Sequence, residues 1–273
     1  MTAMVRNLEI HVAHGCNLTC ESCAHYSNQG HTGLLAVEQA KEWFTDWSHR
    51  LSPQQVALLG GEPALNPKLA DMVKLARAHW RDARLIVVSN GFLLSRHHPH
   101  LPRELAAAGA ELHISIHFDS MQYEAKLEPV RALIDQWDRE FGVQVRWRPS
   151  ESTWTRRYHG WGAGMKPFTD QAPRSSWQHC RARWCVQLHD GQLWKCPPLA
   201  YLPMQRQRHE IGPEWDPYLT YRPLPPTCTD RDLVEFVARE DESYCAMCPA
   251  TPPEFMLSSP LVPIGELLKQ NKP

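Results

Sequence analysis

The stretch LEIHVAHGCNLTCESC, residues 8–23, joins a short apolar run to three closely spaced cysteines. Residues 8–14 have the length and composition of a buried strand, and Cys16, Cys20 and Cys23 follow directly after it. In parallel α/β sheets and barrels, the loops after the carboxyl ends of the strands carry the active site. We therefore expect the three thiols to lie at the functional edge of a parallel sheet.

The pattern of a strand followed by a longer helical segment repeats up to about residue 150. Four further apolar runs are candidate strands, at residues 55–60, 84–90, 111–117 and 143–147. Between them, apolar side chains recur at helical spacing in residues 69–80 and 127–141. Asn66 can cap the first of these helices, and Pro67 can begin it. Such alternation predicts an α/β fold with a parallel sheet.

Composition narrows the class of protein. At 273 residues with 42% hydrophobic side chains, the chain is long enough for one large domain and a small second one. The net charge of -1 gives no basic field that would attract nucleic acid or an anionic membrane. The first residues lack a long apolar run followed by a small-residue cleavage site, so we expect no signal peptide, and no apolar run approaches the roughly 18 residues of a membrane span. We therefore expect a cytoplasmic protein with a small-molecule substrate, in which the nine cysteines favour metal ligation over disulfides.

The second half of the chain has a different composition. After residue 150, Pro, Trp and Arg become dense, and six of the nine cysteines appear. We expect a first domain over residues 1–169 and a smaller second domain over residues 170–273. The last dozen residues of the second domain are expected to form a loosely held tail.

Four cysteines of the second half form a group. HDGQ at 189–192 is a hairpin turn signal, and the hairpin would carry Cys196 back towards Cys180. Cys245 and Cys248 have the spacing of a chelating pair and can complete the group. The sequence thus predicts a second metal site.

The first three cysteines suit an incompletely ligated cluster. A four-iron cluster normally takes four thiolates, so three thiolates leave one iron open to a chelating small molecule. Two alternatives remain open on spacing alone. One is a zinc site that His14 or His25 completes, and the other is three unconnected buried thiols.

The segment GGEP, residues 60–63, follows the second candidate strand directly. Gly60 and Gly61 lack side chains, so the backbone can approach a ligand there, and Glu62 can pair with an ammonium group. Alone, this segment also fits an ordinary tight turn between a strand and a helix. Its position one strand after the cysteine loop favours a binding function.

The spacing of Cys16, Cys20 and Cys23, together with GGEP at 60–63, resembles the radical SAM superfamily. The resemblance implies a partial (β/α) radical SAM barrel, a [4Fe-4S] cluster on the three cysteines and S-adenosyl-L-methionine as cofactor. The residues that it implies for cofactor binding are Gly60, Gly61, Glu62 and Pro63 at the methionyl amino group, with Ser89, Asn90 and Ser115 at the ribose and carboxylate.

One position departs from this resemblance. Many relatives carry an aromatic residue just before the third cysteine, where it packs near the adenine, and in this chain that residue is Ser22. Tyr26 is the candidate substitute for the adenine contact.

The second cysteine group resembles the twitch or SPASM auxiliary-cluster domain of radical SAM enzymes, on Cys180, Cys196, Cys245 and Cys248. Four thiolates ligate a [4Fe-4S] cluster fully and make it an electron carrier, whereas a structural zinc is the alternative. Only Cys228 lies between Cys196 and Cys245, so we expect one auxiliary cluster, the shorter twitch form. Cys185 and Cys228 are left over, and Cys185 can replace Cys180 as a ligand.

The compact chain resembles twitch-bearing dehydrogenases of aminocyclitol or sugar substrates. The resemblance implies a radical SAM oxidoreductase that cleaves S-adenosylmethionine reductively to a 5′-deoxyadenosyl radical and takes hydrogen from a small polyhydroxylated or amino substrate. The auxiliary cluster would accept the substrate electron, and a reductase such as flavodoxin or ferredoxin would supply the reducing electron. The alternatives are a radical SAM maturase or isomerase of a peptide or modified nucleic acid, and a zinc-binding structural protein.

Arg148 is the candidate catalytic residue, which would deprotonate or anchor a substrate hydroxyl. Arg146, His117 and the aromatic stretch at 154–161 are further candidates for substrate contact. A surface or salt-bridged arginine is the alternative for Arg148. The histidines expected to be structural are His11, His14 and His113.

Overall fold

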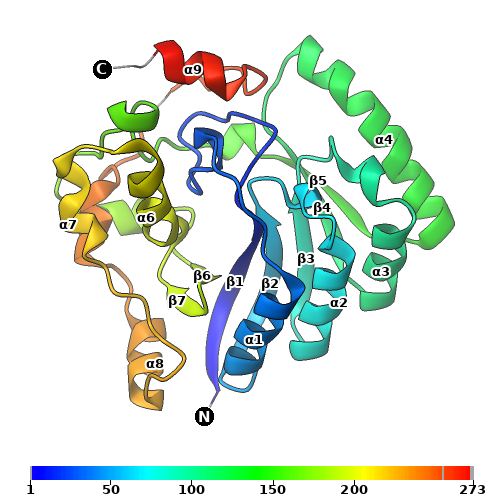
Figure 1. The fold of residues 1–273 in the computed structure, drawn as a ribbon, viewed down its shortest axis with the longest axis horizontal. Helices are drawn as coiled ribbons and strands as arrows, with labels where there is room; N and C mark the ends of the chain where they lie inside the picture. The colour runs from blue at the N-terminus through cyan, green and yellow to red at the C-terminus, as the bar shows by residue number, and fades with distance from the viewer. Residues whose placement is uncertain (1, 254, 271–273) are drawn as a thin grey trace.

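The computed structural model describes residues 2–253 and 255–270, and within them the strands form one seven-stranded sheet in the order β5-β4-β3-β2-β1-β6-β7 (Figure 1). The strands are β1 Ala3–Ala13, β2 Leu51–Gly60, β3 Arg84–Ser89, β4 Glu111–Ile116, β5 Val145–Pro149, β6 Cys185–His189 and β7 Gln192–Trp194. Strands β1 to β6 are parallel, and β7 is antiparallel to β6. The predicted α/β fold with a parallel-rich sheet is confirmed.

Four helices follow the first strands and lie along one side of the sheet in Figure 1: α1 Val37–Ser48, α2 Leu69–His79, α3 His100–Ala108 and α4 Met121–Phe141. The predicted apolar stripes of α2 and α4 are buried, with Met72, Val73 and Trp137 in the same core as the sheet. Ser120 caps α4, because its hydroxyl accepts the Tyr123 N–H at 3.1 Å.

The start of α2 differs from the prediction. The helix begins at Leu69, and Asn66 does not cap it. The buried Asn66 amide instead donates to the carbonyls of Val12 (2.8 Å) and Leu35 (3.0 Å). Its side-chain oxygen accepts the Lys68 N–H at 2.9 Å. Asn66 therefore fastens the entry of α2 to the end of β1.

Among the described residues, the second half of the chain adds five helices: α5 Pro173–His179, α6 Pro197–His209, α7 Asp216–Leu219, α8 Asp230–Ala238 and α9 Ile264–Gln270. Short 3-10 turns connect the elements at Ser27–Gln29, Pro63–Leu65, Leu94–His97, Glu151–Thr153, Gly162–Gly164, Pro213–Trp215 and Ser243–Met247. None of the helices in the described residues is both long and apolar enough to cross a membrane.

The predicted hairpin is present as β6 and β7. Asp190 (φ 50°) and Gly191 (φ 70°) both lie in the left-handed region, which a type I′ hairpin turn requires. Strand β6 also pairs with β1, from Asn7 opposite Cys185 to Ile10 opposite Leu188, so the hairpin extends the main sheet. A domain boundary near residue 170 stays a prediction.

The C-terminal segment is held more firmly than expected. The Thr19 N–H donates to the Pro260 carbonyl at 2.9 Å, and the Thr19 hydroxyl donates to the Val262 carbonyl at 2.6 Å. Helix α9 then lies above the loop that follows β1 (Figure 1). The expectation of a loose tail is therefore wrong up to residue 270, and residues 271–273 lie outside the described residues.

Candidate active site

The strands alternate between a core face and a cavity face. On β1, Leu8 and Ile10 pack into the core beneath the helices, whereas Asn7 and Glu9 face a cavity. The cavity has a volume of about 350 Å³ and is lined by β1 to β5, the start of β6 and the loops at the carboxyl ends of the strands. This is the position at which parallel α/β sheets bind ligands.

The three cysteines of the first loop line this cavity together. Burial raises the pKa of Cys16 and Cys20, and Cys20 is only 6% exposed. Burial also acts to raise the pKa of Cys23, but the contacts with His25 and the backbone hydrogen bonds at His25 and Ser27 together lower that pKa. Three thiols that share one cavity wall fit a cluster with one open iron, since metal binding would supply the driving force for deprotonation.

Gly60 and Gly61 allow the second motif to pack against the cysteine loop. A Cβ atom at Gly60 would lie 2.1 Å from the Ala13 carbonyl oxygen, and one at Gly61 would lie 2.1 Å from the Gly15 carbonyl oxygen. The backbones are joined there, because Gly61 N–H donates to Ala13 and Glu62 N–H donates to Gly15, each at 2.9 Å. Both glycines also line the cavity, as the sequence predicts.

Glu62 is buried among the ends of β2 and β3. Its side chain is fully buried, and neither Glu62 nor Pro63 is among the residues that line the cavity. The carboxylate accepts the Ser89 hydroxyl (2.6 Å), the Asn90 N–H (2.8 Å) and the Ala64 N–H (3.0 Å). The pairing of Glu62 with an ammonium group stays a prediction. The carboxylate holds the ends of β2 and β3 together.

Ser89, Asn90 and Ser115 lie at the cavity wall, as expected from the sequence. The Ser89 oxygen also accepts the Gly91 N–H at 2.9 Å, so this hydroxyl is already engaged on two sides. The Asn90 amide donates to the Asn17 side chain in the cysteine loop at 2.7 Å. Asn90 therefore links the end of β3 to the first cysteines.

The candidate substrate-binding residues separate into two groups. Arg148, His117 and Trp154 line the cavity. The His117 Nδ1 atom is buried without a hydrogen-bond partner, and burial lowers the pKa of this imidazole to about 4. Arg146 is not among the cavity-lining residues, because its guanidinium pairs with Glu111 at 2.7 Å.

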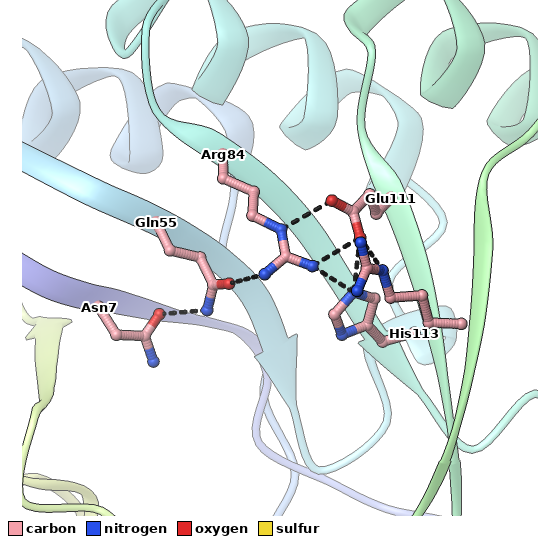
Figure 2. A network of polar contacts seen from close by, with 6 residues as sticks. Asn7, Gln55, Arg84, Glu111 and His113 are labelled. Carbon is pink, nitrogen blue, oxygen red and sulfur yellow. Dashed lines mark hydrogen bonds and ion pairs between the residues drawn. The ribbon is translucent and has the colours of Figure 1, made fainter.

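Glu111 belongs to a polar network that crosses the sheet (Figure 2). The Arg84 guanidinium binds both Glu111 oxygens at 2.7 Å and donates to Gln55 at 3.2 Å, and Gln55 donates to Asn7 at 2.9 Å. His113 lies 3.1 Å from Glu111, which agrees with its expected structural role. The Arg84 hydrogen bonds lower the pKa of Glu111 to about 2. Asn7 and Gln55 carry this network to the cavity wall.

The second cysteine group lines a separate cavity, at Cys180, Cys196, Cys245 and Cys248. Burial raises the pKa of Cys196, that of Cys245 to about 11 and that of Cys248 to about 12. Arg157 lines the same cavity and donates to the Cys180 sulfur at 3.1 Å. Across residues 2–253 and 255–270, no three His, Cys, Asp or Glu side chains are grouped so as to hold a single metal ion. Four thiols around a cavity, with a cation beside them, form a donor set that can hold an iron–sulfur cluster.

The two remaining cysteines belong to neither group. Cys185, at the start of β6, lines the first cavity and not the second. Cys228 packs against the main core, and its carbonyl accepts a hydrogen bond from Arg50 at 2.8 Å. Cys180 and Cys185 are the two candidates for one ligand position of the second group, and the second cavity is lined by Cys180 and not by Cys185.

Residues 10–140 match the radical SAM superfamily. The matched residues include the cysteine loop, GGEP and the ends of β3 and β4, and the second cysteine group lies beyond them. A search of curated proteins finds no match.

Several solved structures are similar to this chain at low sequence identity. A crystal structure of BtrN in complex with AdoMet and 2-DOIA is 17% identical over 91% of this chain and 94% of that chain, with a TM-score of 0.51. Native anSMEcpe with bound AdoMet and Cp18Cys peptide is 15% identical over 52% of this chain and 42% of that chain, at a TM-score of 0.39. Streptococcus suis SuiB bound to S-adenosylmethionine is 10% identical over 73% and 61%, at 0.35. The chain thus spans about two fifths of anSMEcpe.

Glu9 and Gln187 lie beside the cysteine loop, and neither was predicted from the sequence. Glu9 on β1 lies 3.6 Å from His25 and accepts the Gln187 amide at 2.6 Å. Burial acts to lower the pKa of His25, but contacts with Cys23 and Glu9 raise it to about 9. The sequence does offer one signal for Glu9, since it is a charged residue in the middle of an apolar strand. Its partners, His25 and Gln187, lie in other segments of the chain, and no sequence pattern indicates that they lie beside Glu9.

Ser22 and Tyr26 have structural roles beside this loop. The Ser22 hydroxyl accepts the N–H groups of Arg157 (2.6 Å) and Tyr158 (3.1 Å). The Tyr26 ring is fully buried, 5.1 Å from the Tyr158 ring, and does not line the first cavity. The suggestion that Tyr26 replaces an adenine-packing residue is therefore not supported. His11, expected to be structural, stacks on Tyr201 at 4.1 Å.

Proposed function

We propose that this chain is a radical SAM oxidoreductase that removes hydrogen from a small polyhydroxylated or amino substrate and passes the remaining electron to an auxiliary [4Fe-4S] cluster. The observation that carries the proposal is the pair of thiol-lined cavities, one with three cysteines and one with four. The fold shared with BtrN, which was solved with AdoMet and 2-DOIA, supports AdoMet as the cofactor and a small molecule as the substrate.

The residues of the first cavity would hold the cofactors. Cys16, Cys20 and Cys23 would ligate the first cluster, and the backbone of Gly60 and Gly61, which lines the cavity, would receive S-adenosylmethionine with Ser89, Asn90 and Ser115. When bound, these groups supply a 5′-deoxyadenosyl radical for hydrogen abstraction, and the second cluster takes up the electron released by oxidation. Glu62 would hold the GGEP backbone in place through its hydrogen bonds to Ser89, Asn90 and Ala64.

Oxidation of an alcohol to a ketone also releases a proton, and the cavity offers a group to receive it. The Arg148 guanidinium offers hydrogen-bond donors and no acceptor, so it suits anchoring a hydroxyl better than removing its proton. The neutral His117 imidazole has an unpartnered Nδ1 atom in the same cavity. We therefore assign substrate anchoring to Arg148 and proton acceptance to His117.

The proposed partners follow from the same chemistry. A reductase such as flavodoxin or ferredoxin would supply the electron for cofactor cleavage, and neither nucleic acid nor a membrane is a proposed partner. The cytoplasm is the proposed compartment, because all nine cysteines are free thiols and a reducing environment keeps them so.

The test is iron and acid-labile sulfide per chain after anaerobic reconstitution. We expect about eight irons in the wild type and about four when either cysteine group is replaced by alanine. Cys228→Ala is the matched control, because this thiol lines neither cavity, and it should retain the wild-type iron content. Zinc in place of iron, or no 5′-deoxyadenosine on reduction with S-adenosylmethionine, would overturn the proposal.

A further inference from the structure

Arg157 is a buried cation at the second thiol group. It lies in the segment between β5 and α5 and is only 8% exposed. Its guanidinium donates to the Cys180 sulfur at 3.1 Å and lines the cavity with the other three thiols of the group. A buried guanidinium requires a negative partner, because an unpaired charge in the interior is costly. Thiolates that ligate a cluster would provide that partner.

The backbone of Arg157 is fixed by the first cysteine loop. Its N–H donates to the Ser22 hydroxyl at 2.6 Å, and that hydroxyl in turn donates to the Tyr158 carbonyl at 3.2 Å. Ser22 precedes Cys23 in the chain. The side chain of Arg157 thus reaches the second thiol group from a backbone held at the first.

Two other cationic side chains line the second cavity, and both donate to backbone carbonyls. Lys195 donates to the carbonyls of Phe236 (3.0 Å) and Arg239. Arg183 is half-exposed and donates to the Gln178 carbonyl at 2.5 Å. Both line the cavity, yet neither has a hydrogen bond to sulfur among the described contacts. Arg157 differs from them in its direct bond to a thiol.

We propose that Arg157 is a positioning residue that raises the reduction potential of the auxiliary cluster, an inference that rests on the proposed function. Reduction adds one negative charge to a site that already carries four thiolates. A buried cation in contact with one of these sulfurs stabilises the reduced cluster more than the oxidised one, because Coulomb energies are larger in a low dielectric. Hydrogen bonds to cluster sulfurs act in the same direction. The cluster would thereby become a better acceptor for the substrate electron.

The experiment measures the potential of the auxiliary cluster alone. In a Cys16→Ala, Cys20→Ala, Cys23→Ala background, the remaining cluster is titrated with mediators and followed by electron paramagnetic resonance. Arg157→Gln should lower the equilibrium constant for one-electron reduction at least tenfold, which corresponds to 59 mV. Arg183→Gln, which removes a cation of the same cavity without a sulfur contact, should change it much less.

The possible outcomes distinguish a failure of this inference from a failure of the proposed function. If the triple-cysteine background binds no iron, the auxiliary cluster itself is disproved. If the cluster forms and Arg157→Gln leaves its potential unchanged, the assignment of Arg157 is wrong. Should Arg157→Gln fail to retain iron, Ser22→Ala decides. That variant keeps the guanidinium but removes its backbone anchor, so the potential should fall, and an unchanged value would overturn the inference.

Discussion

Glu62→Ala should lower the free energy of unfolding of the metal-free protein by at least about 3 kcal/mol. The fully buried carboxylate accepts hydrogen bonds from Ser89, Asn90 and Ala64 at 2.6, 2.8 and 3.0 Å. Each buried donor left without a partner costs about 1–3 kcal/mol. Three such donors therefore cost about 3 kcal/mol at the lower limit, a large part of the about 5–15 kcal/mol that stabilises a typical domain.

Urea unfolding of the protein without iron measures this loss apart from cofactor binding. The midpoint should shift with an unchanged dependence on denaturant, since the surface exposed on unfolding stays the same. Glu42→Ala, at an exposed position in α1, is the control and should change stability by less than about 0.5 kcal/mol. Ser89→Ala should also destabilise, and the double variant should cost less than the sum of the two single changes, because they share one hydrogen bond. A loss well below about 3 kcal/mol in Glu62→Ala would refute this account of the motif.

Three further results are expected. Gly61→Ala should reduce bound iron per chain, because its Cβ would lie 2.1 Å from a carbonyl oxygen of the cysteine loop, whereas Gly265→Ala, with nothing within 4 Å, should bind iron normally. Substrate-dependent 5′-deoxyadenosine formation should not titrate with His117 between pH 5 and 8, since its pKa is about 4; a fall near pH 6.5 that is absent in His117→Asn would contradict this. Arg84 lowers the pKa of Glu111 from 4.5 to about 2, so Glu111 should stabilise the fold above pH 4.5 and lose that contribution as the pH falls towards 2. Acid unfolding measures this contribution, and the stability of Glu111→Gln should depend less on pH over this range than that of the wild type.

The parts of the fold that depend on local patterns could be predicted from the sequence. Apolar runs located β1 to β5, and helical spacing located α2 and α4. The pairing of β6 with β1 could not be predicted, because it joins residues 178 positions apart, such as Asn7 and Cys185. The alternating polar residues at the start of β1 also hid its true length, since only the later part is a continuous apolar run.

In the candidate site, too, local spacing could be read from the sequence, whereas contacts between distant segments could not. The sequence spacing identified seven cysteines that line two cavities, because ligands on one loop or hairpin are close in the chain. Glu62 was identified as part of the GGEP motif, but its burial and its hydrogen-bond partners were not predicted. Its burial depends on Ser89 and Asn90, which approach from β3. Arg157 escaped notice for a related reason, since its importance appears only when Cys180 lies beside it.

The cysteine loop combines two locally unfavourable backbone conformations with support from distant segments. Ser22 (φ 57°) and Tyr26 (φ 54°) both adopt left-handed conformations that non-glycine residues rarely take, and they flank Cys23. Such conformations persist only where surrounding contacts enforce them. The GGEP backbone, the segment at Arg157 and the C-terminal carbonyls bonded to Thr19 supply those contacts. Changes at any of these supports should therefore alter the geometry of the cysteine ligands even where the sheet and its helices remain folded.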